Sequence, residues 1–100
     1  MVELITQKRE GIAEHCRRLD VRRLEVFGSA ARGTFDPETS DLDFLYEFEG
    51  EENYLHRFLD LAESLESLLG KKVDLLNYRS IRNPYFRASI ERDKELVYGT

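Results

Sequence analysis

The sequence has a single cysteine and no apolar run of membrane length, and these two shortages narrow the classes of protein that it can represent. Cys16 has no second cysteine to pair with, so an internal disulfide is excluded and a reducing compartment is indicated. No segment approaches the ~18 apolar residues of a membrane span, and the N-terminal residues lack the apolar stretch of a signal peptide. We therefore expect a cytoplasmic protein that has no membrane partner.

Internal repeats, low-complexity tracts and linker-like segments are also absent from the sequence. One hundred residues, of which 41% are apolar, suffice for one domain, and we expect residues 1–100 to form a single domain. A domain of this size has room for an active-site floor but little room for a second substrate-binding lobe. An acceptor site supplied by a partner chain, and so a hetero-oligomer, is consistent with this size.

The sequence has no excess of basic charge either. Its formal net charge of −5 argues against a long sequence-independent grip on a phosphate backbone, so we expect no direct binding of DNA. Residues 36–52 are strongly acidic. A solvated face explains residues 47–52 of this stretch, but it does not explain Asp41 and Asp43.

Hydrophobic periodicity predicts helices that alternate with strands. Helices are expected over 3–19, with Gly11 as a weak point in the middle, and over 52–69, with the end at Gly70. Shorter helices are expected over about 83–91 and over 30–32. The expected buried stripe of the 52–69 helix is Leu55, Phe58, Leu59, Ala62, Leu65, Leu68 and Leu69. Residues 41–48 alternate with period two, which predicts a strand, and shorter strands are expected at 24–27, 72–76 and 95–98. Residues 34–40 are expected to form a loop. This order predicts a two-layer α/β domain with helices packed on a small sheet.

Two short motifs carry the chemistry. Gly28 and Ser29 follow a strand, where a glycine lets the backbone approach a ligand and exposed N–H groups and a hydroxyl can hold phosphate oxygens. Asp41 and Asp43 are two residues apart on a predicted strand, so both carboxylates point to the same side. Two such carboxylates are typical ligands of Mg²⁺ together with substrate phosphates.

A pair of exposed aspartates that protects a strand edge is the alternative explanation of Asp41 and Asp43. A third carboxylate favours the metal site. Asp74 supplies one, and it lies in an apolar strand where an unpaired charge is expected to be costly.

The sequences GSAARG at 28–33 and SDLD at 40–43, followed by the lone Asp74, resemble the signature of the polymerase-β-like nucleotidyltransferases. The match is closest to the minimal nucleotidyltransferases (MNT) that are encoded beside HEPN-domain proteins, and it covers most of the chain. The resemblance implies the polymerase-β-like fold, in which a small mixed sheet is packed with helices.

The resemblance also assigns roles to residues of this chain. Gly28 and Ser29 match the pair that holds the phosphates, and Arg32 matches an arginine near them, although a surface cation explains Arg32 equally well. The resemblance also implies that ATP is the substrate and that three aspartates are catalytic residues and ligands of two Mg²⁺ ions. These are Asp41, Asp43 and Asp74. No residue departs from the metal-ligand pattern, whereas the helical base-recognition domain of larger members is missing.

The implied activity is a transfer of AMP from Mg-ATP to a hydroxyl of a partner protein. The resemblance suggests that this partner is a HEPN ribonuclease toxin and that the chain is an antitoxin. The alternative is a binding module that masks its partner without catalysis. Transfer to a small molecule is a third possibility, which the absence of a second lobe weakens.

Several histidine and aromatic side chains are of types that can bind metals or nucleobases, but the sequence does not assign them these roles. His15 and His56 have no partner at metal-ligand spacing, so packing or surface roles are expected for them. Tyr78, Tyr85 and Phe86 are typical of core or interface aromatics, as is Tyr98. A nucleobase could stack on one of these rings, but nothing in the sequence selects which.

Overall fold

A computed structural model describes residues 1–36 and 38–99, and its centre is a mixed four-stranded sheet. The strands lie in the order β3-β2-β1-β4; β2 and β3 run parallel, and the other two pairs are antiparallel. The predicted mixed sheet with packed helices is therefore confirmed. The elements are α1 (Glu3–Gln7), α2 (Arg9–Arg18), β1 (Val21–Phe27), α3 (Ser29–Arg32), β2 (Leu42–Phe48), α4 (Tyr54–Leu69), β3 (Val73–Asn77), the 3-10 turn η1 (Tyr78–Ser80), α5 (Pro84–Asp93) and β4 (Glu95–Gly99).

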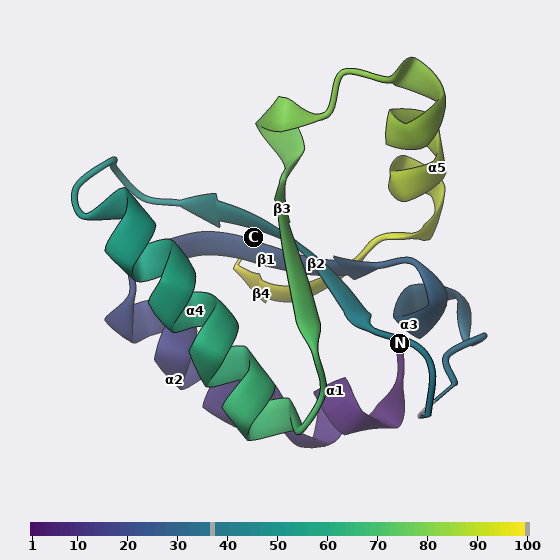
Figure 1. Cartoon of the computed structure of the whole chain (residues 1–100), viewed down its shortest axis with the longest axis horizontal. Helices are drawn as coiled ribbons and strands as arrows, with labels where there is room; N and C mark the ends of the chain where they lie inside the picture. Colours follow the sequence, from purple (N-terminus) through teal and green to yellow (C-terminus); the bar gives the residue numbers. More distant parts are fainter. Residues whose placement is uncertain (37, 100) are drawn as a thin grey trace.

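The two faces of the sheet are covered differently (Figure 1). Helices α2 and α4 lie side by side against one face and enclose the main core with it, whereas α5 stands over the opposite face. A second, smaller cluster on that opposite face joins Leu45 of β2 to Ile81 and to Ile90 of α5. No helix of the described residues is long and apolar enough to span a membrane.

The predicted alternation of β2 is confirmed and decides which side chains reach each face. Leu42, Phe44 and Tyr46 are buried in the main core beneath α2 and α4. Asp43 and Leu45 therefore lie on the opposite face, which we call the open face of the sheet. The candidate carboxylate of β2 is thus held on the side that the two long helices leave uncovered.

The helices differ from prediction in two places. The N-terminal helix is interrupted at Lys8 and not at Gly11, and Gly11 packs inside α2 against Leu68. In α4, Leu55 and Leu59 were expected on the buried stripe, but they are 68% and 56% exposed. The buried stripe starts instead at Arg57. A prediction from hydrophobic periodicity assigns charged residues to the exposed face, so it could not place an arginine on this stripe.

Pro37 of the predicted 34–40 loop lies outside the described residues. On either side of it, the loop is held by hydrogen bonds between its ends. The backbone N–H of Asp36 donates to Ser40 Oγ at 3.0 Å, and the N–H of Ser40 donates to the Asp36 carbonyl at 2.9 Å. These bonds bring the chain back to the sheet just before Asp41 and β2.

Candidate active site

The turn from β1 into α3 brings the backbone close to a carboxylate. Gly28 follows the last residue of β1 with φ 72°, a backbone conformation that favours glycine, and Ser29 begins α3. A Cβ placed on Gly28 would lie only 2.7 Å from Oδ2 of Asp43. The absence of a side chain at position 28 therefore leaves room for the Asp43 carboxylate beside the backbone that the sequence predicts to hold phosphate.

Strand register places Asp43 in the middle of a row across the open face. Its neighbour on β1 is Phe27, and its neighbour on β3 is Asp74. Paired residues of adjacent strands present their side chains to the same face. Three adjacent strands thus bring together the motifs at Gly28, Asp43 and Asp74. The first and the last of these residues are 46 positions apart in the sequence (74 − 28).

The electrostatics of Asp43 reflect this crowding. Its pKa is raised above the ordinary value, first by partial burial and then by the negative charges of Asp74 and Asp41, and a hydrogen bond that the protonated Asp43 carboxyl donates to Asp74 adds to the shift. Arg32 acts in the opposite direction. The charges of Asp41 and Asp74 therefore both act on Asp43, whose ionised form they destabilise.

Asp41 differs from prediction in its position along the chain, and Asp74 differs in its exposure to solvent. Asp41 precedes β2 instead of forming its first residue, because the pairing with β3 begins at Leu42. Asp74 is exposed, so the expectation of a costly charge inside an apolar strand was wrong. β3 is an edge strand, and the open face leaves the side chain of Asp74 in contact with solvent. The support for Asp74 is its register with Asp43 and not its burial.

Arg32 lies at the end of α3 and links this helix to α5. It is exposed, and its Nη1 donates to Asp93 Oδ2 at 3.2 Å. The same guanidinium lowers the pKa of Asp43. Arg32 therefore forms a surface ion pair, and its charge also acts on Asp43.

The carboxylates of the site are ligands that suit Mg²⁺, but they do not form the predicted group of three. Within residues 1–36 and 38–99, no three His, Cys, Asp or Glu side chains are grouped closely enough to hold a metal ion, so a preformed three-carboxylate cluster is not present. Mg²⁺ commonly takes one or two carboxylates and completes its shell with water and substrate phosphates. The space beside Gly28 and the mutual repulsion at Asp43 fit a cation that arrives with a triphosphate.

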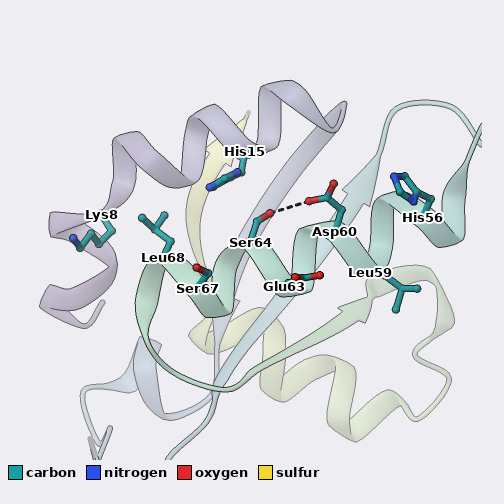
Figure 2. A pocket seen from close by; sticks show the side chains of 9 residues that line it. All are labelled: Lys8, His15, His56, Leu59, Asp60, Glu63, Ser64, Ser67 and Leu68. Carbon is teal, nitrogen blue, oxygen red and sulfur yellow. Dashed lines mark hydrogen bonds between the residues drawn. The ribbon is translucent and has the colours of Figure 1, made fainter.

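A hollow that contains none of these residues lies on the helix-covered side of the sheet. It has a volume of about 820 Å³ between α2 and α4, and Figure 2 shows Ser64 and Asp60 among its lining side chains. Asp60 accepts two hydrogen bonds from Arg18, which together with one from Ser64 lower its pKa to about 2. This carboxylate is already neutralised by a fixed partner, and the sheet separates the hollow from Asp43. We therefore place the candidate active site on the open face.

Two residues of the site were not predicted from the sequence. Phe27 is the register neighbour of Asp43, and Asp93 is the ion-pair partner of Arg32. Neither belongs to a motif, and both are identified only by the pairing of strands and the position of α5. The position of Phe27 one residue before Gly28 was the only available signal.

Comparison with known proteins identifies the relatives of this arrangement. The profile of the family described as "Nucleotidyltransferase domain" matches residues 9–97. MJ1379 of Methanocaldococcus jannaschii, provisionally named a protein adenylyltransferase, is 48% identical over 80 residues, which cover 78% of this chain and 76% of the relative. Protein adenylyltransferase MntA of Thermococcus cleftensis is 41% identical over 81 residues, 81% of this chain and 77% of the relative.

Solved structures agree with the fold. A provisionally assigned minimal nucleotidyltransferase superimposes with a TM-score of 0.76 at 38% identity, covering 93% of this chain and 92% of that one. A structure described as a tri-AMPylated Shewanella oneidensis HEPN toxin in complex with MNT antitoxin has a TM-score of 0.65 at 20% identity, covering 96% and 73%. The second likeness shows the fold alone.

Proposed function

The chain belongs to the nucleotidyltransferase domain family, among the minimal nucleotidyltransferases, and from this premise we propose that it transfers AMP from Mg-ATP to a hydroxyl of a partner protein. The observation that carries the proposal is the convergence on the open face of Gly28, Asp43 and Asp74 from three adjacent strands. Relatives that are named protein adenylyltransferases support AMP as the transferred group.

The residues of the site divide the work of the reaction between them. The backbone at Gly28 and the hydroxyl of Ser29 hold phosphates of the nucleotide at the start of α3, and Arg32 adds positive charge beside them. Asp41, Asp43 and Asp74 hold two Mg²⁺ ions, which, when bound, neutralise charge on the triphosphate. Asp74 would also take up the proton of the attacking hydroxyl, a role that its exposed carboxylate beside Asp43 permits.

The bonds exchanged in this transfer follow from the substrate. The acceptor oxygen forms a bond to the α-phosphorus of ATP, and the bond between the α-phosphorus and the bridging oxygen breaks, so that pyrophosphate leaves. The described residues of the open face beside Asp74 carry no further lobe that would present an acceptor (Figure 1). A partner chain supplies the hydroxyl, and a HEPN toxin of the kind seen with an MNT antitoxin in a solved complex is our proposed partner.

Calorimetric titration with ATP tests the central part of this proposal. We expect EDTA-treated protein to bind ATP at least about 10-fold more weakly than protein supplied with Mg²⁺, because the carboxylates repel a bare triphosphate. Asp43→Asn should lose most of this Mg²⁺ dependence. Asp60→Asn, which removes an aspartate on the other side of the sheet, is the matched control and should retain it. Equal ATP affinity with and without Mg²⁺ would remove the metal role from Asp41 and Asp43.

A second candidate function is a binding module that neutralises its partner by masking it. The specific observation in its favour is the exposure of Asp74 together with the absence, in the described part of the chain, of a preformed three-carboxylate cluster. Such a module needs the surface of the domain but neither ATP nor turnover. The mass of the partner after incubation with the chain and Mg-ATP separates the two functions.

A further inference from the structure

One aromatic side chain stands exposed beside the candidate active site. The ring of Phe86, on α5, meets the ring of Phe27 edge to face, with their centroids 6.3 Å apart and an interplanar angle of 72°. Phe27 is the register neighbour of Asp43 and directly precedes Gly28. Phe86 is 44% exposed, so part of its ring is available to a ligand bound at these residues.

The other aromatic residues are unavailable or lie elsewhere. The ring of Tyr78 is covered by two cations, Arg87 at 4.5 Å and Lys94 at 5.4 Å, and its hydroxyl donates to Glu91. Tyr85 is 87% exposed and extends into solvent. The remaining rings belong to the main core, pack against it or join the aromatic group at the far end of β2: Phe35, Phe44, Tyr46, Phe48, Tyr54, Phe58 and Tyr98.

The position of Phe86 matches the layout of a nucleotide. Phosphates held at Gly28 and Asp43 leave the sugar and base of the nucleotide to extend away from this turn, and Phe86 is the exposed ring that packs on Phe27, the neighbour of Asp43 in the row. The ion pair of Arg32 with Asp93 fixes the same helix, α5, against α3, so the ring and the phosphate turn are held in one arrangement. A planar base gains stacking energy on such a ring whatever its hydrogen-bonding edge.

We propose that Phe86, supported by Phe27, is the platform on which the nucleobase of the triphosphate stacks. This inference rests on the proposed function, because it requires the phosphates to lie at Gly28 and Asp43. It assigns a binding role to α5, an element outside the motifs that mark the family. It also gives the nucleobase a binding position next to the candidate phosphate site.

Two ligands and four proteins test the platform by calorimetry. The ligands are Mg-ATP and Mg-tripolyphosphate, which has the phosphates without the base. We expect Phe86→Leu, which keeps apolar contact with Phe27, to bind Mg-ATP about 5- to 30-fold more weakly than the wild type, in keeping with the loss of one base–aromatic stack. Its affinity for Mg-tripolyphosphate should be unchanged. Phe86→Trp should retain Mg-ATP affinity, and Tyr85→Leu, the matched control on the same helix, should behave as the wild type with both ligands.

Three results would overturn the platform alone: an unchanged affinity of Phe86→Leu for Mg-ATP, an equal loss for both ligands, or a loss in Phe86→Trp as large as in Phe86→Leu. Failure of the wild-type protein to bind either ligand would overturn the proposed function, and this inference with it. The tripolyphosphate titration therefore distinguishes the failure of the base platform from the failure of the phosphate site.

Discussion

Asp43 shows most clearly how one residue can be unfavourable for folding and suited to a reaction. Its carboxylate is partly buried, lies in register with Asp74 and faces the backbone at Gly28, and its pKa is raised as a result. A site whose charges are compensated only by an incoming ligand is expected to cost the empty protein stability. The same repulsion favours a cation that accompanies the substrate.

Asp43→Asn should therefore separate activity from stability. We expect AMP transfer, followed with radiolabelled ATP, to fall at least about 100-fold, because removing a metal ligand should cost no less than removing a residue that only supports one. The fold should be retained, and the melting temperature of metal-free protein at pH 7 should rise by a few degrees as the repulsion is removed. Transfer at the wild-type rate would contradict the role of Asp43.

The pH dependence of this stabilisation has a definite sign. Below the ordinary Asp pKa of 3.8, the carboxyl is protonated in both the folded and the unfolded chain, and Asn at this position gains nothing. As the pH rises above 3.8, the unfolded chain ionises first, so the wild type loses stability until the folded Asp43 has ionised as well. The difference in melting temperature between variant and wild type should thus grow from pH 4 upward and then level off. A difference that shrinks over this range would contradict the raised pKa.

Among the elements, the junction of α2, β1, β2 and α4 depends on one buried arginine. Arg57 is 8% exposed, and its guanidinium donates to five backbone carbonyls, at 2.8 to 3.5 Å, while lying over the ring of Phe48 at 4.3 Å. The carbonyls belong to two turns, at 19–20 and at 49–52. A single side chain thus holds the start of β1, the end of β2 and the start of α4 together.

Arg57→Lys should destabilise the domain strongly. Lysine keeps the charge, but its compact ammonium cannot reach carbonyls on both turns, so several buried acceptors lose their donor. We expect a loss of about 2–4 kcal/mol, which lowers the melting temperature by roughly 10–25 °C in a domain of this size. Arg18→Lys, at an exposed ion pair with Asp60, is the control and should cost at most about 1 kcal/mol. Similar melting temperatures for the two variants would contradict this role of Arg57.

Periodicity predicted the elements well where one face of an element is buried and the other is not. The alternation of β2 and the end of α4 at Gly70 are confirmed in the structure for this reason. Periodicity failed at Leu55 and Leu59, because the buried side of α4 is the one that carries Arg57 and Leu61, and helical spacing turns the two leucines away from it. It also missed Arg57, whose burial depends on carbonyls from turns that are 37 and 38 residues away in sequence at Asp20 and Leu19.

The candidate site was predictable to the extent that its residues lie in short motifs. Gly28 follows β1, and Asp43 and Asp74 lie in register on β2 and β3, so Asp43 lies beside both of the others. The exposure of Asp74 could not be predicted, because the place of β3 at the sheet edge is a matter of topology. Phe86 could not be selected either, since its contact with Phe27 depends on how α5 folds back over the open face.

At the scale of the whole molecule, the arrangement of layers decides what the protein can do alone. Helices α2 and α4 enclose the main core on one face, and α5 covers part of the other, so the carboxylates lie on a face that remains accessible (Figure 1). The chain brings the candidate phosphate-binding turn and the carboxylates to this face, and in our proposal the acceptor approaches it from a partner chain. The same accessible face would also serve a module that only masks its partner.

Incubation of the purified chain with a molar excess of its partner, a HEPN toxin in our proposal, separates these two functions. A catalyst modifies each partner molecule and leaves, so a small amount should silence a large excess when Mg-ATP is present, and the partner should stay silent after separation because the new phosphoester bond survives dilution. Its intact mass should increase by whole multiples of an AMP group, and this increase should be absent with an Asp41→Asn/Asp43→Asn variant. A masking module must remain bound, so inhibition would instead follow stoichiometry, need no ATP and reverse at the dissociation rate of the complex. An unchanged mass together with full, ATP-independent inhibition at equimolar ratio would therefore replace transfer by masking as the function of this fold.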